Sequence, residues 1–158
     1  MNLFETMHIV GPPSFNVFGP RESYKGRTAS MIFHLRNQIK ADDNPKLFKH
    51  GEQRRDHVYV KDVVDATIKA LDTKSGIYNV GTGIGTTFNE LVSLINKTLR
   101  TNKKPEYIEM PFDPNTYQQH TLAETNKAEK QLGFSAEWNL EDAIKDYFAW
   151  LDGQSNTQ

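Results

Sequence analysis

The alternation of apolar and polar positions changes period several times along the chain, and each change predicts a boundary between elements. Short apolar or alternating runs predict strands that end at Phe18 and span Lys46–Phe48, His57–Val60, Ile77–Val80 and Tyr107–Ile108. Apolar residues at helical spacing follow in longer segments, which begin near Thr28, Asp62, Thr87 and Asn139. Strands that alternate with helices predict an α/β fold, here with at most four or five strands.

Capping residues mark where several of these helices begin and end. The segment Thr87-Phe-Asn-Glu90 has the spacing of a capping box, in which two side chains satisfy two helix amides reciprocally. Asp62 and Asn139 stand where N-cap residues belong. Gly133 is expected to close a short helix that begins at Thr125.

A polar loop between the strand that ends at Phe18 and the first helix carries three cations. Arg21, Lys25 and Arg27 lie within seven residues. Guanidinium forks, ammonium groups and the amides of a helix N-terminus all bind phosphate, so this loop is a candidate anion site. The alternative is a solvated turn with a helix cap.

The first predicted helix, Thr28 to Lys40, follows this loop directly. Helical spacing would place four residues on one face, namely Arg27, Ser30, Met31 and His34. Most of the buried contact should come from Ala29, Ile32, Phe33 and Ile39.

Composition allows one modest domain and excludes several classes of function. The chain has 158 residues, 37% of them hydrophobic, and a net charge of -1, so nothing indicates nonspecific nucleic-acid binding. The absence of cysteine excludes disulfides and thiolate metal sites. No apolar run approaches the roughly 20 residues that span a bilayer, and the N-terminus lacks a signal-peptide pattern. We therefore expect a cytoplasmic protein with no membrane partner.

A glycine loop after the predicted strand Ile77–Val80 raises the question of nucleotide binding. Gly81, Gly83 and Gly85 lack the full dinucleotide spacing and the downstream acidic contact to ribose. The loop is therefore not assigned to a cofactor.

Several segments occur in an order that resembles a known family. They are FNVFGPRESYKG, ASMIFHL, NPKLF, RRDHVYVKDVVDA, SGIYNVGTG and TYQQHT. Together they resemble the carboxyl-terminal half of the ADP-L-glycero-D-manno-heptose 6-epimerases, a family of extended short-chain dehydrogenases/reductases. The RDxVYV and YNxGTG motifs are shared widely among nucleotide-sugar epimerases and dehydratases, whereas the GPREx(2)KG, PKLF and YQxxT segments are more specific to the heptose epimerases.

The resemblance implies a domain organisation. Residues 15–152 would form the substrate-binding part of an extended short-chain dehydrogenase/reductase, with the N-terminal Rossmann half largely missing. Residues 1–14 match nothing in the family, and residues 153–158 are expected to be a disordered tail. A homo-oligomer or a complementing N-terminal half would cover apolar faces at Phe15, Val17 and Phe18 and on the first helix.

The resemblance also implies which residues contact ligands. Asn16 matches an Asn that meets the sugar nucleotide, and Val17 matches a backbone position near the NADP of the complete family enzyme. Lys25 matches a cofactor-binding Lys that is also a proposed proton acceptor, which makes it the candidate catalytic residue. Arg27 falls where the family has a substrate-contacting Ser. The other implied substrate-binding residues are His34, Phe48, Lys49, His50, Gly51, Arg55 and Tyr117, among which Arg55 would bind the diphosphate.

Each assignment has a structural alternative. Arg55 and Asp56 can form an ordinary surface pair, His34 can be a polar-face residue, and Tyr117 can simply pack. Asp62 is interpreted as a cap. Trp138 and Trp150 are expected in the core or at an interface.

The implied function is the conversion of ADP-D-glycero-D-manno-heptose to its L-glycero epimer, a step in the synthesis of lipopolysaccharide heptose precursors. Within these residues we find neither the glycine-rich cofactor fingerprint nor a Tyr-x-x-x-Lys pair in the right setting, so we expect the isolated chain not to turn over. The alternatives are a remnant of another nucleotide-sugar epimerase or dehydratase, and a non-catalytic sugar-nucleotide-binding or interaction module.

Overall fold

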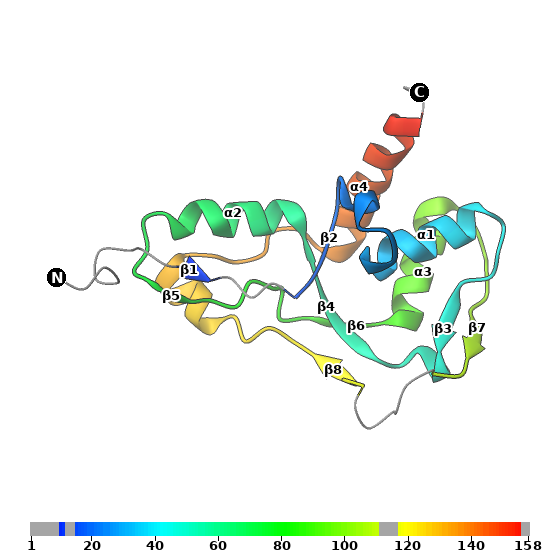
Figure 1. The fold of residues 1–158 in the computed structure, drawn as a ribbon, viewed down its shortest axis with the longest axis horizontal. Coiled ribbons are helices and arrows are strands. Elements are labelled where there is room, and N and C mark those ends of the chain that lie inside the picture. The colour runs from blue at the N-terminus through cyan, green and yellow to red at the C-terminus, as the bar shows by residue number, and fades with distance from the viewer. Residues whose placement is uncertain (1–9, 12–14, 111–116, 156–158) are drawn as a thin grey trace.

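A computed structural model gives the arrangement of these elements and confirms the α/β class (Figure 1). The structure describes residues 10–11, 15–110 and 117–155. Its helices are α1 (Met31–Lys40), α2 (Val60–Ala70), α3 (Phe88–Leu99) and α4 (Leu140–Ser155). Shorter turns of helix are η2 (Glu22–Thr28), η3 (Lys49–Gly51) and η4 (Ala128–Leu132).

The strands are more numerous and shorter than the pattern predicted. They are β1 (Val10–Gly11), β2 (Asn16–Phe18), β3 (Lys46–Phe48), β4 (Arg54–Tyr59), β5 (Gly76–Ile77), β6 (Gly85–Thr87), β7 (Glu106–Ile108) and β8 (His120–Thr121). The expectation of at most four or five strands is therefore wrong. Of these strands only β4 exceeds three residues, and the predicted strand Ile77–Val80 contributes just its first residue to β5.

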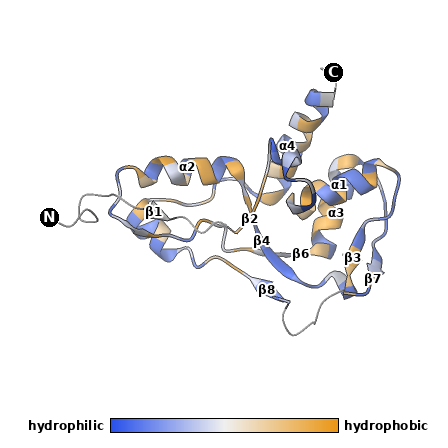
Figure 2. Cartoon of the chain, in the orientation of Figure 1, coloured by the Kyte–Doolittle hydropathy of each residue, from blue (hydrophilic) through white to orange (hydrophobic). Residues whose placement is uncertain are grey.

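Strand β4 connects the central sheet. It pairs in parallel with β2, where Asn16 lies opposite His57, and antiparallel with β6, where Arg55 lies opposite Thr86. Strand β8 also pairs with β4, while β3 pairs with β7 and β1 with β5. The first half of β4 is hydrophilic in Figure 2 although its side chains are mostly buried, so its polar groups need partners inside the protein.

Two apolar clusters flank β4. The larger joins α1, α3 and α4, which gather at one end of the molecule in Figure 1, and its fully buried members include Ile32, Leu35, Leu91, Ile95 and Ile144. The smaller lies between α2 and η4 and includes Ala66, Tyr78, Val80, Ala128 and Phe134. Strand β4 and its neighbours are thus held from both sides, which positions the polar side chains at the centre.

Helix ends were predicted correctly where they depend on residues only a few positions apart. Thr87 and Glu90 form the predicted capping box, with a Glu90 N to Thr87 Oγ1 distance of 3.0 Å and a Thr87 N to Glu90 Oε2 distance of 2.7 Å. Asn139 accepts a hydrogen bond from the Asp142 amide at 2.9 Å, as expected of a cap. Gly133 ends η4 with a φ of 64°, the left-handed conformation that favours glycine.

Other boundaries were predicted wrongly. Helix α1 begins at Met31 rather than Thr28, because Ser30 caps it and accepts from the Phe33 amide. Phe33 is only half-buried, and Leu35 takes its expected place in the core. Helix α2 begins at Val60, so Asp62 is not its cap but a residue of its first turn.

The C-terminal helix also differs from expectation. Helix α4 runs to Ser155, three residues into the segment 153–158 that was expected to be a disordered tail. Apolar residues of α4 explain its length, since Tyr147 and Phe148 are buried and Trp150 and Leu151 pack against the same cluster. Residues 156–158 lie outside the described part of the chain, as do residues 1–9 and 12–14 of the segment 1–14 that was expected to match nothing in the family.

Candidate functional site

Alternation along β4 sends consecutive polar side chains in opposite directions. Arg55 and Asp56 are both buried, at 9% and 0% exposure, so the interpretation of an ordinary surface pair is wrong. The Arg55 guanidinium lies over the rings of Phe88 and Tyr117, at 5.8 and 5.1 Å from their centroids. Asp56 instead accepts hydrogen bonds from the loop that begins at Gly81.

The Arg55 guanidinium is fixed on one edge. Its Nη1 donates to the carbonyl of Arg54 at 2.9 Å and to that of Gln119 at 3.4 Å. No described carboxylate forms an ion pair with it. A guanidinium has five N–H donors, so this arrangement holds the group in place and leaves donors for a bidentate anion such as a diphosphate.

Three of the predicted substrate residues converge beside Phe88. His34 of α1, Phe48 of β3 and Tyr117 line one cavity of about 190 Å³, which we call the α1–β3 cavity. The rings of Phe48 and Tyr117 meet edge to face, with centroids 6.3 Å apart. Aromatic walls with a phenol hydroxyl and an imidazole suit a sugar or a base.

Another three predicted residues line a neighbouring cavity. Asn16, Val17 and Lys25 surround a space of about 390 Å³ between β2 and the start of α1, which we call the β2–α1 cavity. Met31 and Phe88 line both this cavity and the α1–β3 cavity. The two spaces are therefore adjacent parts of one site, and Phe88, which sequence reasoning missed, stands between them.

The cationic loop contributes an acidic side chain to the start of α1, where the sequence suggested an anion site. Glu22 is buried and accepts hydrogen bonds from the Ser30 amide at 2.7 Å and the Ser30 hydroxyl at 2.8 Å. An internal carboxylate thus occupies both donors of Ser30, the N-cap residue of α1. Arg27 is exposed, belongs to η2 rather than α1, and lines neither cavity, so it does not share a helical face with His34.

The predicted run Phe48 to Gly51 enters the site only through Phe48. Lys49 pairs with Glu109 at 2.8 Å, and the carbonyl of His50 accepts from Asn89 at 2.7 Å. Gly51 is buried with a φ of 65°, and a Cβ there would lie 2.4 Å from the Asn89 side-chain oxygen. The turn therefore requires glycine. It orients Phe48, but Gly51 itself lines neither cavity.

The glycine loop after Val80 has an internal ligand in Asp56. The Asp56 carboxylate accepts from the amides of Thr82 at 2.9 Å, Gly83 at 2.9 Å and Ala123 at 3.1 Å, and from the Thr82 hydroxyl at 2.6 Å. A Cβ at Gly81 would lie 2.7 Å from the same carboxylate. These amides are therefore not available to a phosphate, in agreement with leaving the loop unassigned to a cofactor.

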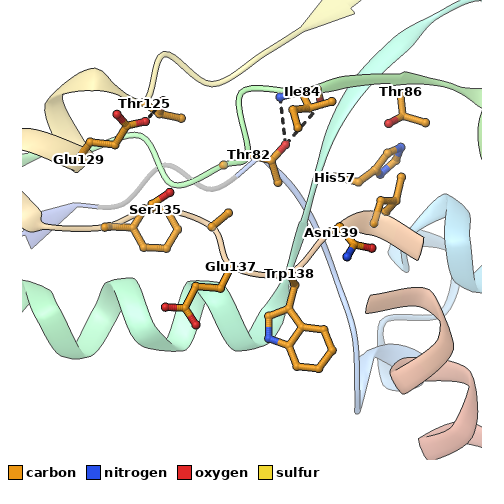
Figure 3. Close-up of a pocket in the computed structure, with 14 residues that line it drawn as sticks. His57, Thr82, Ile84, Thr86, Thr125, Glu129, Ser135, Glu137, Trp138 and Asn139 are labelled. Carbon is orange, nitrogen blue, oxygen red and sulfur yellow. Dashed lines mark hydrogen bonds between the residues drawn. The ribbon is translucent and has the colours of Figure 1, made fainter. Parts of the chain in front are cut away.

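His57 is a second residue that sequence reasoning missed. It is 5% exposed, and neither ring nitrogen forms a hydrogen bond within the described structure. Burial lowers the pKa of His57 to about 4, so the imidazole is neutral near pH 7. Its ring lines the β2–α1 cavity and also a third cavity of about 310 Å³, shown in Figure 3, which contains none of the predicted site residues.

Neither a metal site nor a membrane-spanning helix is found in the part of the chain that the structure describes. No group of three or more His, Asp or Glu side chains is placed to hold a metal ion. None of the described helices is both long and apolar enough to cross a membrane.

Comparison with known proteins supports the resemblance seen in the motifs. The model of the NAD dependent epimerase/dehydratase family matches residues 4–81. The ADP-L-glycero-D-manno-heptose-6-epimerase of Fusobacterium nucleatum is 45% identical over 150 residues, which cover 84% of this chain and 45% of that protein.

Solved structures agree. The crystal structure of the Helicobacter pylori ADP-L-glycero-D-manno-heptose-6-epimerase matches with a TM-score of 0.83 and 40% identity, covering 90% of this chain and 44% of that one. The UDP-glucose 4-epimerase of Thermotoga maritima, solved with UDP-glucose, matches with a TM-score of 0.83 and 28% identity, covering 92% and 46%. The chain thus spans about half the length of these relatives.

Proposed function

We propose that this chain, which belongs to the NAD dependent epimerase/dehydratase family, is the substrate-binding portion of an ADP-glycero-manno-heptose 6-epimerase. The single observation that carries this proposal is the buried Arg55 guanidinium, held over the rings of Phe88 and Tyr117, two residues that line the adjacent cavities. A fixed guanidinium with free donors suits a diphosphate, and the Phe88 ring that it covers borders both cavities.

The two cavities have different roles in this proposal. The α1–β3 cavity, with His34, Phe48 and Tyr117, offers aromatic walls to one part of the sugar nucleotide. The β2–α1 cavity, with Asn16 and Lys25, receives the part where the chemistry occurs. The relatives named for ADP-heptose favour adenosine as the nucleoside, and the relative solved with UDP-glucose makes a uridine nucleotide the alternative to test.

The proposed cofactor is NADP, which supplies reversible hydride transfer when bound. Val17 and Lys25 both line the β2–α1 cavity, so they fit one edge of such a cofactor. The Lys25 side chain is exposed and unpaired within the described structure, which leaves it free to reach a ligand in this cavity and to take an acid/base role there. We assign Lys25 this acid/base role, and Asn16 the role of orienting the sugar.

Calorimetric titration with ADP tests the diphosphate assignment. Arg55→Ala should weaken ADP binding by about 1.5 to 3 kcal/mol, the range of a charge-assisted hydrogen bond. Arg55→Lys restores charge without the planar fork and should rescue only part of the loss. The control is Arg100→Asn, since Arg100 is exposed in a left-handed C-cap that Asn adopts readily.

The outcomes separate the alternatives. Equal ADP affinity in the parent chain and both Arg55 variants would refute the diphosphate site. Tighter binding of UDP than of ADP would favour another nucleotide-sugar epimerase. We expect ADP-heptose to bind without conversion, because these residues contain neither the glycine-rich cofactor fingerprint nor a Tyr-x-x-x-Lys pair in the right setting. A coupled epimer assay on the purified chain checks this.

A further inference from the structure

His57 is a buried polar side chain that the protein itself does not satisfy. Its ring is 5% exposed, and both nitrogens are without a hydrogen-bond partner among the described residues. Buried polar atoms are almost always paired, and an unpaired one costs free energy. A partner supplied by a bound ligand would remove this cost.

The position of His57 on β4 connects it to the proposed site. Residues two apart on a strand point to the same side, so His57 shares a face with Arg55, about 7 Å along the strand. Both contact the same ring, since Phe88 lies 5.8 Å from the Arg55 guanidinium carbon and 6.5 Å from the His57 ring centroid. Across the sheet, His57 lies opposite Asn16 in register.

The β2–α1 cavity places His57 between two proposed ligand contacts. His57 lines this space together with Asn16 and Lys25, and it shares the Phe88 ring with Arg55, which does not itself line the cavity. Consider a ligand whose diphosphate binds Arg55 and whose reacting carbon lies at Lys25. The part of that ligand between the diphosphate and the reacting carbon would then contact His57. In a sugar nucleotide that part is the sugar ring.

We propose that His57 is a further ligand-contacting residue of this site, whose imidazole hydrogen-bonds a hydroxyl group of the bound sugar. This inference rests on the proposed function. A neutral imidazole presents one donor and one acceptor, which matches a hydroxyl group that also both donates and accepts. Sequence reasoning had no signal for the role, because His57 occupies a strand position that is defined only by its neighbours in space.

In the third cavity too, the ring forms no hydrogen bond with any described residue. Figure 3 shows the imidazole beside Thr86, whose hydroxyl forms no hydrogen bond within the described structure. The side-chain amide of Asn139, which also lines this cavity, is committed to Asp142, with an Asn139 Nδ2 to Asp142 Oδ2 distance of 2.7 Å. The alternative to ligand contact is that the ring only packs on Phe88.

Calorimetry with two ligands separates these roles. His57→Phe keeps a flat ring against Phe88 and removes both nitrogens. We expect it to weaken ADP-heptose binding about tenfold, the effect of losing one hydrogen bond, and to leave ADP binding unchanged. His57→Gln, which keeps a donor and an acceptor, should recover part of the loss. His120→Gln, at an exposed histidine of β8, is the matched control and should change neither affinity.

NMR on the parent chain provides a second test, which does not depend on whether a His57 variant folds. With ¹⁵N-labelled histidine, the His57 ring resonances should shift on addition of ADP-heptose and not on addition of ADP. Absence of that shift, or equal losses for ADP and ADP-heptose in His57→Phe, would overturn the assignment. If neither ligand binds the parent chain, the proposed function falls as well. If both bind and His57→Phe behaves as the parent, only the His57 inference fails.

Discussion

The pH dependence of stability gives a direct test of the buried state of His57. Burial, with a smaller contribution from Arg55, lowers its pKa to about 4 from the ordinary 6.5, while Asp56 acts in the opposite direction. The unfolded chain therefore takes up a proton at His57 near pH 6.5, and the folded chain does so only near pH 4. Stability is fully present above the unfolded value and falls as pH decreases through the interval between the two.

The size of this effect follows from the interval. A difference of about 2.5 pKa units corresponds to about 3.4 kcal/mol once protonation is complete. Between about pH 7.5 and about pH 5, linkage gives a loss of about 2 kcal/mol from His57 alone. That is a substantial fraction of the stability of a domain of this size.

Urea unfolding of the parent chain and of His57→Phe across this pH range measures the effect. Phenylalanine takes up no proton, so the free energy of unfolding of the variant should fall less, by about 2 kcal/mol at the acid end. Carboxyl groups whose pKa is held low by partners, such as Glu141 beside Lys145 and Asp146 beside Lys61, titrate in both proteins and cancel in the difference. Parallel profiles for the two proteins would refute the buried, neutral state of the ring.

Two further predictions concern the scaffold and its surface. Thr87→Ala removes the cap of α3 and should lower the free energy of unfolding by about 1 kcal/mol, whereas Thr87→Ser should retain most of it; urea titration measures both, and equal losses would contradict the capping role. On α2, Val64 and Ile68 are 53% and 60% exposed one turn apart, so we expect concentration-dependent self-association that the double substitution to Gln reduces; light scattering that shows identical monomers would contradict this.

The self-association predicted from the sequence named different residues. It assigned the uncovered apolar face to Phe15, Val17, Phe18 and the first helix. Phe18 is 1% exposed and packs 5.2 Å from the ring centroid of Tyr59, so it belongs to the core. Exposed apolar residues instead include Val64 and Ile68 on α2, and others outside that helix such as Ile84.

Features that depend on residues a few positions apart were predicted well. The capping box of Thr87 and Glu90, the cap at Asn139 and the glycine that closes η4 are all contacts within one or two turns. The candidate site residues Arg55, His34 and Tyr117 were predicted from the family resemblance, because the local pattern gives no information about their surroundings. Their ligand roles stay predictions.

Buried carboxylates account for most of what was missed. Asp62 was interpreted as a cap, but it accepts from the amides of Glu137 and Trp138, which lie 75 and 76 positions away. Burial raises its pKa, while these hydrogen bonds oppose the rise. Glu22 similarly closes the loop onto Ser30. From sequence alone, a charged residue is predicted to lie on the surface. The backbone amides that bind it inside the protein come from distant positions, so the spacing of residues does not reveal them.

Asp56 is the carboxylate on which the site depends most, and Asp56→Asn tests this. Its oxygens accept from the amides of Thr82, Gly83 and Ala123, so an Asn amide nitrogen would face donors rather than acceptors. We expect the free energy of unfolding to fall by about 3 kcal/mol, the cost of leaving buried groups unpaired. ADP affinity should fall too, because β4 also positions Arg55.

The matched control is Asp65→Asn, which breaks only a surface pair with Lys69 and should cost less than about 1 kcal/mol. Urea titration that finds equal, small losses in the two variants would show that the glycine loop holds its shape without Asp56.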